Sequence, residues 1–66
     1  MIKIEIVPAD PSMPAIVTWL TEAEYIAQGA GDLDYSQLYR VTTSREDGRV
    51  ISEVYPHGLT SPWSLN

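Results

Sequence analysis

The stretch QLYRVTTSREDGRVISEVY, residues 37–55, decides the fold of this 66-residue chain. Two runs rich in β-branched and aromatic residues, 37–44 and 49–55, flank the dipeptide Asp47-Gly48. Such runs are typical of strands, and Asp-Gly between them is typical of a two-residue type I′ turn. The stretch therefore predicts an antiparallel β-hairpin.

The turn sets the register of this hairpin. With two turn residues, the numbers of paired residues sum to 95, so Glu46 faces Arg49 and Val41 faces Val54. A three-residue loop would place Arg45 opposite Arg49, and a like-charge pair destabilises a sheet. We therefore expect the two-residue turn. The core face of the hairpin is then formed by Tyr39, Val41, Val50 and Val54, and its other face by Arg40, Thr42, Ser44, Ile51, Glu53 and Tyr55.

The N-terminal residues 2–7 predict a further strand. Aliphatic and charged side chains alternate along it, which is the pattern of a strand with one buried face. The buried face carries Ile2, Ile4 and Ile6, and the other face carries Lys3 and Glu5. Residues 8–14 contain three prolines and form a loop.

Residues 15–20 fit two structures. Their β-branched and Trp side chains favour a strand, whereas Pro14 suits the first position of a helix running to Gln28. Thr21, followed three residues later by Glu24, is a capping box, which begins a helix. We favour a strand followed by a short helix from Glu22, and the continuous helix stays as the alternative.

The whole chain, residues 1–66, is expected to form a single α+β domain. Gly29 is placed to end the helix, and residues 29–34 form a loop before the hairpin. The segment 56–66 contains two prolines and a glycine, so we expect an irregular tail that packs on the sheet. The predicted fold is a small antiparallel sheet of three or four strands with one short helix on a face.

Composition excludes several classes of partner and cofactor. Nine acidic and four basic residues give a net charge of −5, which disfavours binding to nucleic acid or to anionic membranes. The chain has no Cys and one His, so neither a disulfide nor an ordinary zinc site is expected, and no cofactor is predicted. The N-terminus lacks the apolar run of a signal peptide, so we expect a cytoplasmic protein.

No residue pattern predicts catalysis. His57 lies in a turn sequence with no nucleophile motif near it. The carboxylate pairs Asp32/Asp34 and Glu22/Glu24 are spaced by two residues and lack the further ligands of a calcium loop. We therefore expect a protein that is not an enzyme and holds no metal.

The acidic residues are unevenly distributed. No Lys or Arg occurs from residue 4 to residue 39, whereas residues 40–66 carry equal numbers of acids and bases. Such an unbalanced field attracts basic partners, and tyrosines beside charges suit an interface. The predicted partner-binding residues are Glu5, Asp10, Glu22, Glu24, Tyr25, Asp32, Asp34 and Tyr35.

In size, acidity, absence of Cys and lack of an enzyme motif, the chain resembles small phage-encoded inhibitors of bacterial defence. It is most similar in type to anti-CRISPR proteins that act as DNA mimics, although no specific motif matches. The resemblance implies binding to a basic surface of a nucleic-acid-handling complex. The alternative is a structural or assembly protein completed by self-association or edge-strand pairing, and a homodimer is compatible with both.

Overall fold

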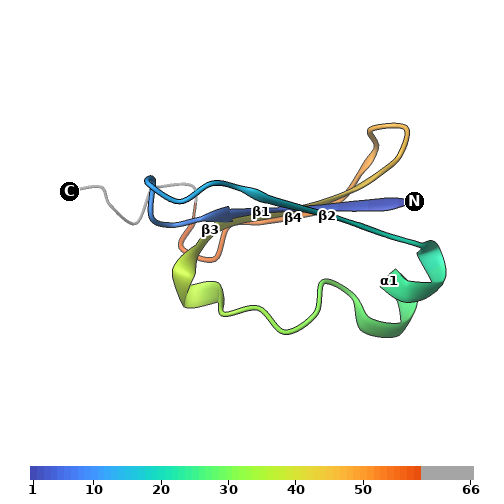
Figure 1. The fold of residues 1–66 in the computed structure, drawn as a ribbon, viewed down its shortest axis with the longest axis horizontal. Helices are drawn as coiled ribbons and strands as arrows, with labels where there is room; N and C mark the ends of the chain where they lie inside the picture. The colour runs from blue at the N-terminus through green and yellow to red at the C-terminus, as the bar shows by residue number, and fades with distance from the viewer. Residues whose placement is uncertain (59–66) are drawn as a thin grey trace.

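A computed structural model describes residues 1–58 and confirms the α+β class. Four antiparallel strands form one sheet in the order β2-β1-β3-β4 (Figure 1). The elements are β1 (Ile2–Pro8), β2 (Ile16–Leu20), α1 (Glu22–Gln28), the 3-10 helix η1 (Tyr35–Gln37), β3 (Leu38–Arg45) and β4 (Val50–Val54). The predicted tail 56–66 lies outside the described residues from residue 59 onward.

The core lies between the sheet and the segment 21–37. This segment, which contains α1 and η1, lies along one face of the sheet (Figure 1). Ile2 and Ile4 of the central strand β1 are each 2% exposed, and they are the most deeply buried large side chains of the described chain. Around them pack Leu38, Val41, Ile6, Leu20, Tyr25, Ala30 and Leu33.

The strand prediction for residues 15–20 is confirmed, and the continuous helix is wrong. The capping box forms as expected: the Thr21 hydroxyl accepts a hydrogen bond from the Glu24 amide at 3.1 Å. The Glu24 carboxylate accepts one from the Thr21 amide at 2.9 Å. Both donors belong to the first turn, where no carbonyl of a preceding turn is available, so α1 begins after Thr21. Gly29 ends it, with a φ of 58°.

The hairpin prediction is confirmed, but its two-residue turn is wrong. The Arg45 amide donates to the Arg49 carbonyl at 2.7 Å, and the Gly48 amide donates to the Arg45 carbonyl at 2.9 Å. The loop therefore has three residues, with Gly48 supplying the positive φ that such a loop needs. The expected repulsion is avoided because the Arg45 side chain binds Glu22 and the Arg49 side chain lies by Asp47.

A β-bulge in β4 restores the predicted register over the rest of the hairpin and changes which residues of β4 face the core. Thr43 pairs with Ser52, as a sum of 95 requires, but Ser44 pairs with Val50. The extra residue, Ile51, turns toward Ile2 and lines the helix side of the sheet, while Val50 lies on the opposite face with Ser44. The predicted placements of Val50 and Ile51 are therefore both wrong.

A second bulge, where β1 pairs with β3, displaces Tyr39 from the predicted core face. Pro8 pairs with Leu38 while Val7 pairs with Arg40, so Tyr39 is the extra residue. Leu38 takes its place in the core, and the Tyr39 ring packs edge-on against Tyr55 with centroids 5.7 Å apart.

Truncation of Ile4 tests the position of the core. Because this side chain is 2% exposed, Ile4→Ala is expected to lower the free energy of unfolding by about 2–5 kcal/mol. Urea denaturation followed by circular dichroism measures this loss. Ile26→Ala, at a helix position that is 83% exposed, is the matched control and should change stability by less than about 0.5 kcal/mol. Equal losses in the two variants would contradict the described core.

Candidate protein-binding interface

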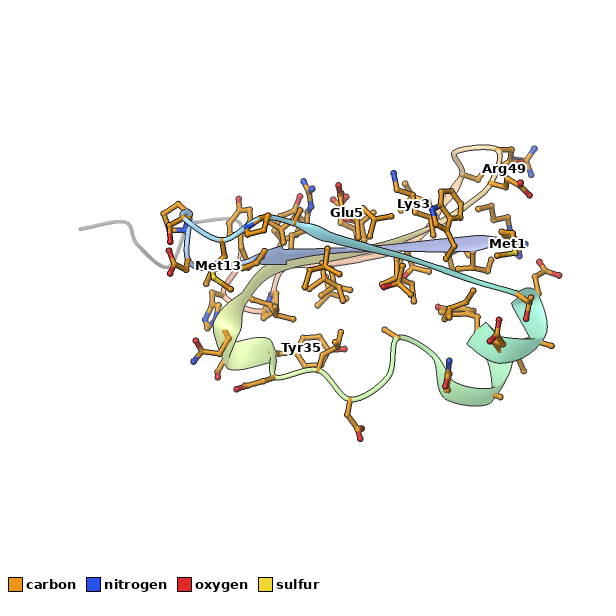
Figure 2. The ribbon with its side chains drawn as sticks, in the orientation of Figure 1. Met1, Lys3, Glu5, Met13, Tyr35 and Arg49 are labelled. Carbon is orange, nitrogen blue, oxygen red and sulfur yellow. The ribbon has the colours of Figure 1, made fainter. Side chains whose placement is uncertain are left out.

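The six early acidic residues do not share one surface. Lys3 and Glu5 of β1 lie on one side of the sheet, and Tyr35 lies on the other side with the segment 21–37 (Figure 2). Asp10 follows β1 in the loop that leads to β2. The structure therefore separates Glu5 from the acids of segment 21–37. The Asp10 loop instead adjoins the end of η1, where the Ala9 amide donates a hydrogen bond to the Gln37 carbonyl at 2.9 Å.

Glu5 is occupied by an ion pair on the open face of the sheet. Its carboxylate accepts a hydrogen bond from the Arg40 guanidinium at 2.9 Å. Both side chains are about one-third exposed, and they lie on neighbouring strands. The pair links β1 to β3, so Glu5 has a structural role that the sequence analysis did not assign to it.

Asp10 organises its own loop. One of its oxygens accepts hydrogen bonds from the Ser12 amide at 2.9 Å and from the Ser12 hydroxyl at 2.8 Å. These bonds, the amide first, hold the pKa of Asp10 below its ordinary value because they stabilise the charged form. The arrangement is a local Asx turn, so the loop accounts for this acid.

The remaining four acids form what we call the acidic layer. They are carried by α1 and by the connection to β3, and all four side chains belong to exposed residues. They are Glu22, Glu24, Asp32 and Asp34. Because the segment that carries them packs on one face of the sheet, they lie on that side of the molecule, distributed along it from α1 to the start of η1 (Figure 1).

Two carboxylates of the acidic layer are held in place by capping bonds. Glu24 uses its Oε1 to accept from the Thr21 amide. Asp34 uses its Oδ1 to accept from the Ser36 amide at 3.2 Å and from the Ser36 hydroxyl at 2.6 Å, which starts η1. In the contacts among residues 1–58, the second oxygen of each group receives no bond. Each carboxylate is therefore fixed in position and still able to accept a donor.

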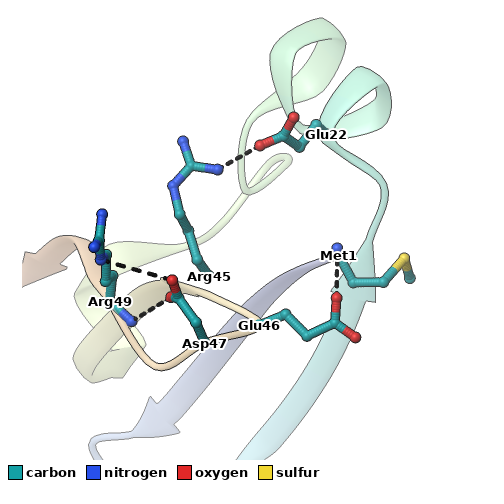
Figure 3. A network of polar contacts seen from close by, with 6 residues as sticks. All are labelled: Met1, Glu22, Arg45, Glu46, Asp47 and Arg49. Carbon is teal, nitrogen blue, oxygen red and sulfur yellow. Dashed lines mark hydrogen bonds and ion pairs between the residues drawn. The ribbon is translucent and has the colours of Figure 1, made fainter.

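Arg45 is the cation that contacts the acidic layer within the described chain. Its guanidinium forms an ion pair with Glu22 that joins the end of β3 to the start of α1 (Figure 3). The predicted pairing of Glu46 with Arg49 is wrong, since Glu46 lies 3.3 Å from the N-terminal ammonium of Met1. Glu22 is thus partly neutralised, whereas Asp32 has no hydrogen bond or ion pair among residues 1–58.

The two tyrosines predicted for the interface differ in their exposure to solvent. Tyr25 points inward and packs against the isoleucine core, so most of its ring is unavailable to a partner. Tyr35 is an exposed residue of η1, next to the capped Asp34. Of the pair, the structure leaves Tyr35 as the aromatic side chain that a partner can contact.

A small open groove beside α1 was missed by the sequence analysis. It has a volume of about 260 Å³, an apolar floor and one ion pair at its rim. Its lining residues are Ile2, Glu22, Tyr25, Ile26, Arg45 and Ile51. No local pattern in the sequence signals this groove, because its lining comes from β1, α1, β3 and β4, which are far apart in the chain.

Within residues 1–58, no group of His, Asp and Glu side chains is arranged to hold a metal ion. His57 lies in the predicted turn, with its ring Nε2 at 3.2 Å from the Ser36 carbonyl oxygen. No helix in this part of the chain has the length and apolar character needed to span a membrane. Comparisons with protein-family models, curated proteins and solved structures found no match to the chain.

The capping bonds predict a pH dependence of stability. The hydrogen bonds from Thr21, its amide first, hold the pKa of Glu24 below its ordinary value of 4.5. A lowered folded-state pKa stabilises the fold above the unfolded pKa, and this stabilisation is lost as the pH falls through the folded value. Glu24→Gln is therefore expected to lose less stability than the wild type between about pH 6 and pH 3.

Urea midpoints measured across that pH range test this expectation. Asp32→Asn is the matched control, because it removes one carboxylate of the same layer that makes no contact within the described chain. It should keep the pH dependence of the wild type. If Glu24→Gln and the wild type lose stability equally on acidification, the carboxylate cap does not contribute as described.

Proposed function

We propose that this chain is a non-enzymatic inhibitor that binds a basic surface of a nucleic-acid-handling protein complex through its acidic layer. A CRISPR surveillance complex in the host cytoplasm is the target that we propose, with the carboxylates taking the place of DNA phosphates. One observation carries the proposal: four exposed carboxylates lie on one layer that a single cation, Arg45, contacts within residues 1–58. Such a surface has a negative field that steers basic partners.

Fixed carboxylates favour this function. Binding costs less side-chain entropy when the binding group is already held in position. Glu24 and Asp34 are held by capping bonds that leave one oxygen of each unbonded among the described residues. Asp32 adds a charge with no hydrogen bond or ion pair among residues 1–58, and Tyr35 adds an exposed aromatic ring. These features resemble a strip of charges presented on a rigid support.

The proposed interface is smaller than the predicted one. We retain Glu22, Glu24, Asp32, Asp34 and Tyr35. Three of the predicted residues serve the fold of this domain: Glu5 binds Arg40, Asp10 binds Ser12, and Tyr25 packs in the core.

A second candidate function is assembly through an edge strand. Strand β2 lies at the edge of the sheet, and its outer side has no partner strand within residues 1–58. Four of its five side chains are exposed, Ile16 and Thr18 on one face and Val17 and Trp19 on the other. An apolar edge of this kind pairs readily with another strand, as the structural or assembly alternative requires.

Competition for DNA binding tests the inhibitor proposal. The protein in excess is added to a purified, guide-loaded surveillance complex and its labelled target DNA. We expect DNA binding to fall, and the inhibition to weaken about 10-fold or more as salt rises from about 50 to about 500 mM, because charge pairs are screened. Undiminished DNA binding at low salt would overturn the proposal for that complex.

A matched pair of variants locates the interface. The triple variant Glu22→Gln, Asp32→Asn, Asp34→Asn removes three charges of the acidic layer and is expected to weaken inhibition about 10-fold or more. The control removes three acids elsewhere, with Asp10→Asn, Glu46→Gln and Glu53→Gln, so both variants have the same net charge. If both triple variants weaken inhibition equally, the inhibition depends on the net charge of the protein and not on the acidic layer.

A further inference from the structure

Within residues 1–58, strand β2 is a sheet edge that no other segment pairs with on its outer side. Its sequence, Ile16-Val17-Thr18-Trp19-Leu20, has no charged residue, proline or glycine. The exposed fractions are 54% for Ile16, 47% for Val17 and 49% for Trp19, so apolar surface is exposed on both faces of the strand. Soluble proteins ordinarily protect an edge with a charge, a proline or a bulge.

The opposite edge shows that protection. In β4 the bulge at Ile51 interrupts the pairing with β3. Glu53 also places a carboxylate in this strand, where it accepts a hydrogen bond from the Tyr55 hydroxyl at 3.0 Å. By contrast, β2 pairs with β1 without interruption over its whole length, so it is straight enough to receive another strand.

We propose that β2 pairs antiparallel with β2 of a second copy, so that two sheets join into one of eight strands. This proposal rests on the second candidate function, assembly through an edge strand. Closed pairing of two identical edges gives a two-fold dimer, which buries both β2 edges. The joined sheet then ends on each side in β4, the edge that carries the bulge at Ile51.

The backbone restricts the register of such a pair. Alternate residues of an edge strand direct their N–H and C=O groups outward, so hydrogen-bonded partners from identical strands have numbers of the same parity. When the residue numbers of two directly opposed partners are added, the sum is therefore even. A sum of 36 pairs all five residues of β2 and places Thr18 on the two-fold axis. Sums of 34 or 38 leave residues at one end unpaired.

This register also matches the side chains. Val17 of one copy lies opposite Trp19 of the second, and Ile16 lies opposite Leu20. Because directly paired residues share a face, each face gains two apolar cross-strand pairs. An aromatic side chain beside a β-branched one is among the favourable cross-strand combinations.

The charges nearest to β2 lie on β1, and this register sets no like charges against each other. Lys3 is paired with Trp19, and Glu5 with Val17. Placing Trp19 opposite Val17 of the second copy therefore sets Lys3 and the second copy's Glu5 in one row. They are about 14 Å apart there, and Glu5 is already paired with Arg40, so these charges do not oppose the pairing. The net charge of −5 on each copy opposes association, but β2 itself contributes none of it.

One strand pair is a small interface. It falls below the roughly 1,200 Å² that separates stable interfaces from weak encounters, so we expect dissociation constants of about 10–100 μM. Sedimentation equilibrium from about 10 μM to about 1 mM is expected to show a monomer–dimer equilibrium. Hydrogen exchange of the amides of residues 16–20 should slow as the concentration rises. A monomer at about 1 mM with exchange independent of concentration would overturn the proposal.

Substitutions at the two-fold axis test the register. Thr18→Lys and Thr18→Glu each set like charges against one another, so each variant alone should dimerise about 5-fold more weakly or worse. An equimolar mixture of the two should recover dimerisation through opposite charges. Failure of the mixture to recover would overturn the pairing centred on Thr18.

Val50→Lys is the matched control, because it adds the same charge to the exposed side chain of the other edge strand. It should dimerise like the wild type, and a loss equal to that of Thr18→Lys would overturn the assignment to β2. Thermal unfolding checks that each variant folds, and the exchange measurement on the wild type stands if one does not. Thr18 lies outside the acidic layer. A monomeric protein would therefore contradict the dimer proposal, but it would not contradict the proposed inhibition of DNA binding, which the competition experiment tests separately.

Discussion

Burial of the isoleucine stripe on β1 is the constraint on which the rest of the structure depends. Ile2 and Ile4 lie on a central strand with β2 on one side and β3 on the other, and the segment 21–37 covers them. A domain of this size hides only about 60% of the surface of its unfolded chain, so few side chains can be buried completely. The segment 21–37 therefore has to pack on the face of the sheet that carries Ile2 and Ile4. The ion pair of Glu5 and Arg40 lies on the opposite face.

The acidic residues have two kinds of role. Some carboxylates complete the fold: Glu5 pairs with Arg40, Asp10 closes a loop, and Glu24 caps α1. Asp32 has no such contact within the described chain. Only some of the acids in the first part of the sequence are therefore available to a binding partner. What remains is the acidic layer on one side, with the apolar edge of β2 as a separate surface, so an inhibitor and a dimer are compatible.

The parts of the fold that were predicted correctly depend on short-range patterns. The alternation in residues 2–7 and the capping box at Thr21 act through neighbouring residues, and both appear as expected. The failures depend on distant contacts. The expected repulsion between Arg45 and Arg49 disappears because Glu22, which is far away in the sequence, binds Arg45. The bulge residue Ile51 faces the core side, where it lies by Ile2 in the groove beside α1.

The sequence by itself determined the class of fold, the start of the helix, the existence of the hairpin and the imbalance of charge, because these follow from local periodicity, capping and composition. Only the tertiary structure decided which acids lie on the same side of the sheet. A charge on β1 is separated from a charge on α1 by the thickness of the sheet, and that separation depends on strand order and on which face the helix covers. The tertiary structure also decided that β2 is an edge, since the position of a strand in a sheet depends on pairing among segments far apart in the chain.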